Sequence, residues 1–369
     1  MRRSLTLDDL RRFAVTRSLF PPTTLGRAID NLAFVQADPI RAPARAQDLT
    51  LRHRVRGYRT GDLERRYASL GIEEDVFINY GFLPQSVQVL MHPRATESQA
   101  RRHRRTQSLL AFVQERGTVH PREVDAHFAH GTVTNYWGGS SNATTHLLEL
   151  MHYRGLLRVA RREGGIRIYA VAERIAPPQD RAARHTQIDR LVDRLAAAYA
   201  PLPARSLAMV VRRLRYAVPQ WRGELPAAIQ RARHRLSQAR VDGIDWYWPA
   251  GERLSTRPAP DAVRLLAPFD PVVWDRDRFE SFWGWAYRFE AYTPAAKRKL
   301  GYYALPLLWR DRVIGWGNVS VRGADLHAHV DFVAASPASD LAFRRELDLE
   351  LDRLRAFLTL TGRAASNRS

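Results

Sequence analysis

The sequence contains no cysteine and very little lysine. The missing cysteine excludes disulfide bonds, thiolate nucleophiles and cysteine-ligated zinc or iron–sulfur clusters, so any metal ion would need histidine and carboxylate ligands. Lys297 and Lys299 are the only lysines. No run approaches the roughly 18 consecutive apolar residues of a transmembrane helix, and the basic N-terminus meets Asp8 and Asp9 instead of a hydrophobic segment. We therefore expect neither membrane attachment nor secretion, and a cytoplasmic protein.

Positive charge is in large excess. The 369 residues include 58 Lys and Arg against 38 Asp and Glu, for a formal net charge of +20. A GC-rich coding bias explains the use of arginine instead of lysine, but it does not explain the excess of cations. Such a charge favours association with a polyanion, so we expect a nucleic-acid partner and a nucleoid-associated location. The length predicts two or three domains.

The element pattern is clearest over residues 106–176. Helical periodicity and capping predict three helices there, and two alternating segments around the Glu163-Gly164-Gly165 turn predict a hairpin. Three helices followed by a hairpin is the order of a winged helix. Residues 177–256 repeat this order less cleanly, and residues 1–105 carry short helices and a loop at 79–84.

Residues 257–369 differ in composition. Alternating aromatic segments, including Phe282 to Tyr292, predict strands, followed by a helix near residues 339–360 and a frayed tail from Arg363. The expected fold class is therefore α+β. We predict tandem winged-helix domains over residues 1–105, 106–176 and 177–256, and a β-rich domain over residues 257–369.

The sharpest candidate site lies at the end of the apolar run Leu32 to Val35. Gln36 and Asp38 follow it one residue apart, and Pro39 pushes Asp38 out of the helical region, so both polar side chains sit at the end of an element. Asp before Pro also commonly forms a turn, and a glutamine there often satisfies a backbone group. Local chemistry alone favours this structural interpretation.

Three longer segments carry a family resemblance. They run from Phe34 to Gln47, from Leu265 to Pro271 and from Thr293 to Pro306. With them the chain resembles the YcaQ/AlkZ-like winged-helix DNA glycosylases, which remove alkylated bases and unhook interstrand crosslinks. The resemblance implies tandem winged helices and a C-terminal β domain around a DNA-binding channel.

The catalytic motif of that family is Gln, a hydrophobic residue, then Gln or Asp, and it matches Gln36-Ala37-Asp38. By resemblance, Asp38 stabilises an oxocarbenium-like sugar and accepts a proton from water, while Gln36 orients that water. Few amines are available for a Schiff base, which favours a monofunctional hydrolase. No cofactor, no metal and a monomer are expected, with alkylated double-stranded DNA as the partner. The expected DNA-binding residues are Arg41, Arg45, Gln47, Tyr80, Lys297, Arg298, Lys299, Tyr302 and Tyr303.

The family usually carries Glu-Tyr-Trp-Ala-His where this chain has Asn79-Tyr80-Gly81-Phe82-Leu83, so only the tyrosine is shared. The main alternative function is a non-catalytic winged-helix DNA-binding protein or transcription regulator. A nuclease is a third, but it would need clustered carboxylates for Mg²⁺ that these basic segments do not offer. His120, His127 and His130 lie close together in the sequence without the spacing of a zinc motif.

Overall fold

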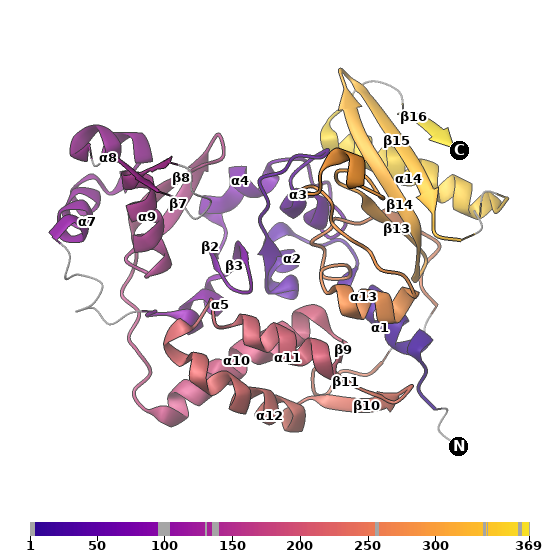
Figure 1. Cartoon of the computed structure of the whole chain (residues 1–369), viewed down its shortest axis with the longest axis horizontal. Coiled ribbons are helices and arrows are strands. Elements are labelled where there is room, and N and C mark those ends of the chain that lie inside the picture. Colours follow the sequence, from indigo (N-terminus) through magenta and orange to yellow (C-terminus); the bar gives the residue numbers. More distant parts are fainter. Residues whose placement is uncertain are drawn as a thin grey trace. The chain divides into compact units, whose positions relative to one another are not determined.

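A computed structural model describes residues 4–94, 104–129, 131–134, 140–254, 258–334, 337, 339–360 and 364–368. Helices and strands are mixed along the chain, so the α+β class is confirmed (Figure 1). The contacts divide the chain into two compact units. The first unit comprises Met1–Asp62, Asp193–Val210 and Ile229–Ser369, and the second comprises Leu63–Val192 and Val211–Ala228. No helix within the described residues is both long and apolar enough to cross a membrane.

The first unit contains short N-terminal helices and the C-terminal sheet. Its elements are α1 (Leu7–Ser18), α2 (Leu25–Leu32), β1 (Val35–Gln36), α3 (Ala46–Leu51), β9 (Leu202–Pro203), β10 (Ser237–Val241), β11 (Ile244–Trp248), β12 (Val263–Leu265), α13 (Arg276–Trp283), η4 (Ala295–Lys297), β13 (Leu305–Trp309), β14 (Arg312–Arg322), β15 (Asp325–Phe332), α14 (Leu341–Leu358) and β16 (Ala364–Arg368). The helices α10 (Arg181–Tyr199), α11 (Ala204–Arg213) and α12 (Leu225–Arg235) have residues in both units.

Helix α1 contributes to two hydrophobic clusters of the first unit. Thr6 and Asp9 form a reciprocal capping box at its start, which satisfies backbone donors that the first turn leaves open. One side of the helix, with Val15, packs into a cluster with strands of the C-terminal sheet. The other side, with Phe13, packs into a cluster around Trp246. A single amphipathic helix thus joins two hydrophobic clusters whose remaining members come from the C-terminal half of the chain.

The C-terminal sheet has the order β12-β13-β14-β15-β16, antiparallel except that β16 runs parallel to β15. Helix α14 lies beside it, and Phe343 of that helix meets Trp309 edge to face at 5.7 Å (Figure 1). The prediction of a frayed tail was wrong for residues 364–368, which pair with β15 through backbone hydrogen bonds. Such pairing does not depend on side-chain pattern, so the sequence gives no signal for it.

The prediction of a strand from Phe282 to Tyr292 was also wrong. Helix α13 extends to Trp283 and is ended by Gly284, whose φ of 74° suits the left-handed cap. The aromatic side chains beyond it gather around Phe279, with ring centroids 5.3 Å from Trp285 and 5.7 Å from Tyr287. These residues are aromatic because they fill a core, not because they alternate across a sheet.

The second unit contains α4 (Asp62–Arg66, of which Asp62 belongs to the first unit), η1 (Tyr67–Ser69), β2 (Ile72–Val76), β3 (Tyr80–Pro84), α5 (Gln85–Gln88), η2 (Val89–Met91), α7 (Arg104–Arg116), β4 (Thr118–Val119), α8 (Pro121–Phe128), β5 (Thr132–Thr134), β6 (Ser140–Asn142), α9 (Ala143–Tyr153), β7 (Leu157–Glu163), β8 (Ile166–Val171) and η3 (Pro219–Glu224). The predicted three helices and hairpin are present, and the hairpin joins a sheet of order β4-β8-β7.

The predicted loop at 79–84 is mostly strand. Strand β3 pairs antiparallel with β2, from Val76 opposite Tyr80 to Ile72 opposite Pro84. Strand β2 carries three consecutive acids, Glu73, Glu74 and Asp75, and all three are buried. A run of acids is unusual in a strand because their charges repel one another and lose solvation. The residue types of β2 therefore did not predict this hairpin.

Candidate active site

Gln36 and Asp38 lie where a short buried strand ends. Helix α2 stops at Ala33, which has a positive φ of 58°, and Phe34 and Val35 then enter the core of the first unit. Pro39 follows and is exposed. Asp38 itself is buried, with 7% of its surface accessible. A carboxylate at this position loses much of its hydration.

Two hydrogen bonds hold Asp38. The Ile40 N–H donates to its Oδ1 at 2.8 Å, and its own backbone N–H donates to Oε1 of Gln47 at 3.2 Å. Gln47 lies on α3 and is 3% exposed, so it acts as a fixed support. Burial raises the pKa of Asp38, and the bond from Ile40 offsets only part of that effect. The carboxylate is therefore a stronger base than an exposed aspartate.

The Gln36 amide is oriented by an aromatic residue far away in the sequence. The indole N–H of Trp274 donates to Oε1 of Gln36 at 2.9 Å. The Trp274 ring in turn lies against Tyr199, with centroids 5.2 Å apart. The bond assigns the carbonyl end of the amide to Trp274, so Gln36 has a set orientation beside Asp38.

Tyr303, in the C-terminal part of the first unit, lies within electrostatic range of Asp38. It is 4% exposed, and its hydroxyl has no hydrogen-bond partner among the described residues. Burial and then the negative charge of Asp38 raise the pKa of Tyr303 well above its usual range. Its ring meets Phe289 edge to face at 5.2 Å. A neutral hydroxyl donor is thus held within electrostatic range of a buried carboxylate.

Tyr303 also lines a groove of about 830 Å³. No acidic residue is among the described side chains that line it, and the basic or aromatic ones are Arg41, Tyr302, Tyr303, Arg322, His327 and His329. Tyr302 is 44% exposed, and Arg41 is also exposed. Asp38 does not line this groove itself, so Tyr303 is the link between the groove and the carboxylate. The groove, which we call the Tyr303 groove, suits a polyanion that carries planar rings.

The loop that carries the two lysines is fixed by one buried acid. Oε2 of Glu290 accepts the backbone N–H groups of Lys299, Leu300 and Gly301 at 2.8, 2.7 and 3.3 Å. The loop backbone is therefore rigid although Lys297 and Lys299 are exposed. The guanidinium of Arg298 lies over the ring of Tyr302 at 5.0 Å. The exposed lysine side chains thus extend from a hydrogen-bonded loop that leads to Tyr302, a residue of the groove wall.

Gly301 is required where this loop meets the sheet. Its φ is 117°, and a Cβ placed there would lie 2.3 Å from Oδ1 of Asn318. Asn318 lines the Tyr303 groove and donates to the carbonyl of Leu300 at 2.8 Å. A side chain at residue 301 would break that bond and change the groove wall.

A fully buried ion pair connects the two sequence segments that form the site. Arg54 donates to both oxygens of Asp270, at 2.7 and 2.9 Å, and both side chains are 0% exposed. The same guanidinium also donates to the carbonyls of Ser18 and Thr50. Such a bidentate pair fixes geometry as well as charge. It holds the residues after α3 against the turn that leads to Trp274.

Tyr80 belongs to the second unit. Its hydroxyl donates to Oε2 of Glu74 at 2.8 Å, and the guanidinium of Arg167 lies over its ring at 4.4 Å. Burial, followed by the charge of Glu74, raises the pKa of Tyr80 well above its ordinary value. Glu74 also pairs with Arg162 at 2.6 Å. Within this unit, Tyr80 takes part in a network of buried charges.

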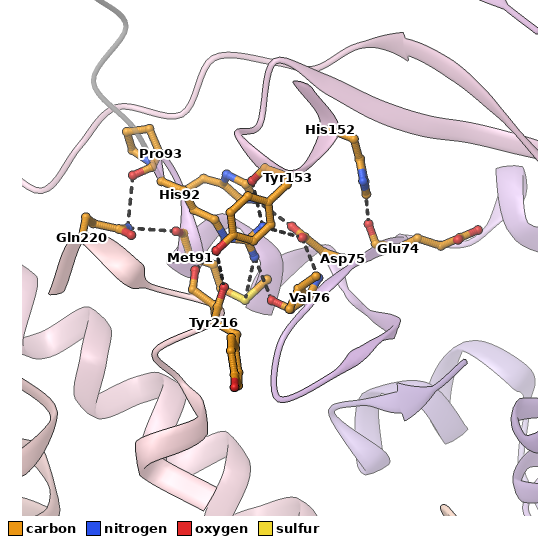
Figure 2. A network of polar contacts seen from close by, with 12 residues as sticks. Glu74, Asp75, Val76, Met91, His92, Pro93, His152, Tyr153, Tyr216 and Gln220 are labelled. Carbon is orange, nitrogen blue, oxygen red and sulfur yellow. Dashed lines mark hydrogen bonds and ion pairs between the residues drawn. The ribbon is translucent and has the colours of Figure 1, made fainter. Parts of the chain in front are cut away.

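Asp75 is the centre of a second polar network in that unit (Figure 2). It accepts from Arg94 at 2.6 Å and contacts Nε2 of His92 at 2.7 Å. Burial alone would raise the pKa of Asp75, but Arg94 and His92 outweigh it and hold that pKa well below its usual range. Arg94 also donates to the carbonyls of Tyr153 and Val76. The acids of β2 are therefore neutralised from several elements, which explains why the strand is stable.

The predicted site residues fall into three groups. Asp38 is hydrogen-bonded to Gln47, Gln36 is hydrogen-bonded to Trp274, and Tyr303 lies within electrostatic range of Asp38. The residues beside or along the groove are Arg41, Lys297, Arg298, Lys299 and Tyr302. Arg45 precedes α3 and is half-buried, and Tyr80 lies in the other unit.

Trp274, Glu290 and Asn318 were not predicted from the sequence. A tryptophan three residues after Pro271 and a glutamate inside an aromatic run carry no signal of their function. Trp274 acts through a hydrogen bond to a segment 238 positions away, whereas Glu290 and Asn318 bond the nearby loop at residues 299–301.

The histidines of the second unit have structural contacts. His120 caps α8 by accepting from the Arg122 N–H at 3.0 Å, and His127 stacks on Phe112 at 4.5 Å. His130 lies outside the described residues. Over the described part of the chain, no group of three histidines and carboxylates is placed to hold a metal ion.

Two comparisons relate the chain to known proteins. A family model described as "DNA glycosylase AlkZ-like" matches residues 29–357 of the 369. Among solved structures, the Streptomyces sahachiroi DNA glycosylase AlkZ matches with a TM-score of 0.65 at 13% sequence identity, covering 100% of each chain. At that identity the structural match shows the fold, and the family model carries the relationship.

Proposed function

The chain belongs to the AlkZ-like DNA glycosylase family, and we propose that it removes N7-alkylated purines from DNA, with Asp38 and Gln36 as its catalytic residues. Membership of the family makes it a hydrolase of N-glycosyl bonds in DNA. The observation that carries this proposal is the buried Asp38, whose carboxylate accepts from the Ile40 N–H and whose own backbone N–H donates to Gln47. Asp38 acts electrostatically on Tyr303, which lines a groove with basic side chains.

The substrate's own charge sets what the enzyme must supply. An N7-alkylguanine is cationic and departs as a neutral base, so the leaving group needs little acid catalysis. The transition state concentrates positive charge on the sugar, which a nearby carboxylate stabilises in a low-dielectric site. Asp38 has the charge, and its raised pKa makes it a better proton acceptor for the attacking water.

Gln36 positions that water in this proposal. Its carbonyl end accepts from Trp274, which restricts the amide to one orientation beside the carboxylate. The hydroxyl of Tyr303 lies within the influence of the Asp38 charge and has no described partner, so it is available to a substrate group or to the water. Gln47 supports the Asp38 backbone and, at 3% exposure, is better suited to that role than to touching DNA.

DNA contacts are assigned to the groove and its loop. Arg41 and Tyr302 line the groove, and Lys297, Arg298 and Lys299 flank it on the loop held by Glu290. Cationic side chains there would contact phosphates, while the exposed ring of Tyr302 offers a stacking face. Arg45 and Tyr80 remain proposed contacts of the same kind. We include interstrand crosslinks among the proposed substrates because the groove is open instead of a closed pocket for one base.

The domain assignment is part of the proposal. The order α7, β4, α8, β5, β6, α9, β7, β8, in which three helices precede the β7–β8 hairpin, supports a winged helix over residues 106–176. The order α10, β9, α11, α12, β10, β11 repeats it over residues 177–256, with β10, β11 and β9 in one sheet. Residues 1–105 would form the first such domain and residues 257–369 the C-terminal one.

Release of N7-methylguanine from alkylated duplex DNA tests the function. We expect the free base and abasic sites to form in the presence of a chelator, without strand breaks. Borohydride should trap no covalent enzyme–DNA adduct, because the two lysines sit on the exposed loop and are not needed for the chemistry. Duplex binding without base release would instead support a non-catalytic DNA-binding protein. A trapped adduct would contradict the monofunctional mechanism.

A further inference from the structure

A second cavity of the first unit is lined largely by cations. It has a volume of about 550 Å³ and lies between the residues that follow α3, strand β12 and the end of α14. It shares no lining residue with the Tyr303 groove. Its polar lining residues include Arg52, His53, Arg56, Arg59, Arg264 and Arg353. No carboxylate is among the described side chains on its wall.

Arg264 has no anionic partner of its own. The structure gives its side chain neither a hydrogen bond nor an ion pair to a described residue, although it is only partly exposed. Burial lowers the pKa of Arg264; Glu350 opposes this effect, while Arg54, Arg353 and Arg52 add to it. An arginine held among other arginines, facing a cavity, is an unfavourable arrangement unless an anion enters.

Positive charge exceeds negative charge around this cavity. Glu350 is the carboxylate that contacts its arginines, and it is already bound by Arg52 at 2.5 Å, Arg353 at 3.1 Å and the backbone N–H of Leu265 at 2.9 Å. The end of α14 adds only about half a negative charge. Burial, followed by the charges of Arg52 and Arg264, holds the pKa of His53 well below its usual range, so that ring is neutral. Two more carboxylates bind lining residues, Asp48 through the Tyr58 hydroxyl and Asp62 through the backbone N–H of Arg59. The five guanidinium groups still outnumber the carboxylates bound to lining residues.

We propose that this cavity binds a phosphate group, with Arg264 at its wall and Arg56 at its exposed rim as donors. Planar guanidinium groups suit the oxygens of a phosphate because each offers paired N–H donors in a fixed geometry. A phosphate also brings enough charge to balance the excess. The group belongs either to a DNA backbone or to free phosphate, since both present the same chemistry. The site is separate from Asp38 and does not depend on how the base is removed.

The test is the affinity of the protein for inorganic phosphate, measured by isothermal titration calorimetry at low ionic strength. Arg264→Gln and Arg56→Gln each remove one donor, and Arg205→Gln is the matched control because its side chain is 83% exposed on α11 and is not part of the cavity. We expect both cavity variants to bind phosphate about tenfold more weakly, with the control unchanged. Because Arg56 is exposed, Arg56→Gln should fold normally. Its phosphate affinity therefore tests the site if Arg264→Gln proves too unstable to purify.

The salt dependence of duplex binding separates the two sources. If the cavity holds a backbone phosphate, each cavity variant should reduce the slope of log K against log salt by about 0.9, and phosphate should compete with DNA. If it holds free phosphate, that slope should match the wild type while phosphate binding still falls. The proposal is overturned if both variants equal the wild type in phosphate binding and in salt slope. Base release assayed on the same proteins reports on Asp38 independently.

Discussion

Replacing Asp38 by asparagine should separate catalysis from stability. The amide has nearly the same shape, and its oxygen can still accept from the Ile40 N–H, which now donates to Oδ1 at 2.8 Å. Only the negative charge and the ability to take a proton are lost. A unit charge about 4 Å from a developing cation contributes about 4 kcal/mol at an effective dielectric constant of about 20. We therefore expect base release to slow by about 10³-fold.

The Asp38→Asn substitution should not lower the stability of the folded protein, although it slows base release. The folded-state pKa of Asp38 is raised above its ordinary value, so the folded protein holds this proton more tightly than the unfolded chain does. Above both pKa values the ionised carboxylate costs stability, and that cost disappears as the pH falls through the folded-state value. Asp38→Asn removes the cost, so its melting temperature at neutral pH should equal or exceed that of the wild type.

The assay is single-turnover release of N7-methylguanine, with thermal melting of the same samples. Asp30→Asn is the control, because Asp30 is an exposed aspartate of α2 and its substitution makes the same chemical change. In the wild type, base release should also fall on the acidic side, at a pH above the ordinary pKa of an aspartate. An Asp38→Asn enzyme within a few-fold of the wild-type rate would refute the catalytic assignment. A large loss of stability would refute the pKa argument.

Three further outcomes follow from other contacts. Tyr303→Phe should leave the melting temperature nearly unchanged, because its hydroxyl has no described partner, yet slow base release; an unchanged rate would remove Tyr303 from the mechanism. Replacing Lys297 and Lys299 by alanine should weaken duplex binding and lower the magnitude of the salt slope by up to about 2, measured by fluorescence anisotropy. Asp75→Asn should lower the free energy of unfolding by about 3–5 kcal/mol in urea titrations, because it leaves the buried Arg94 without its ionic partner; a change under 1 kcal/mol would contradict this.

Local signals in the sequence predicted several helices, but neither α13 nor the charged hairpin. Helix α1 was predictable because Thr6 and Asp9 form a capping box that can be read along the chain. Strand β2 was not, because Glu73 and Glu74 are stabilised by Arg158 and Arg162, more than 80 residues later. The residue pattern of one segment does not show which charged residues of a distant segment will neutralise it.

The same limit applies to the site. The spacing of Gln36 and Asp38 with Pro39 indicates an element end, and the family resemblance assigns them a function. The local sequence does not indicate that Trp274 binds Gln36 or that Tyr303 lies within electrostatic range of Asp38. Both interactions depend on how the C-terminal part of the first unit packs on the N-terminal part, and the buried pair of Arg54 and Asp270 connects these two parts.

The large sequence separation between the two interacting segments affects how the protein forms its site during translation. Gln36 and Trp274 are 238 positions apart, so a ribosome that has delivered the Gln36 segment must still synthesise most of the protein before its partner exists. At elongation rates of about 5–20 residues per second, that interval is roughly 10–50 s. During it, the Asp38 segment has neither its indole support nor the C-terminal wall of its groove. A nascent chain that ends before Trp274 therefore lacks part of the proposed site, and base removal as proposed becomes possible only after most of the chain has been made.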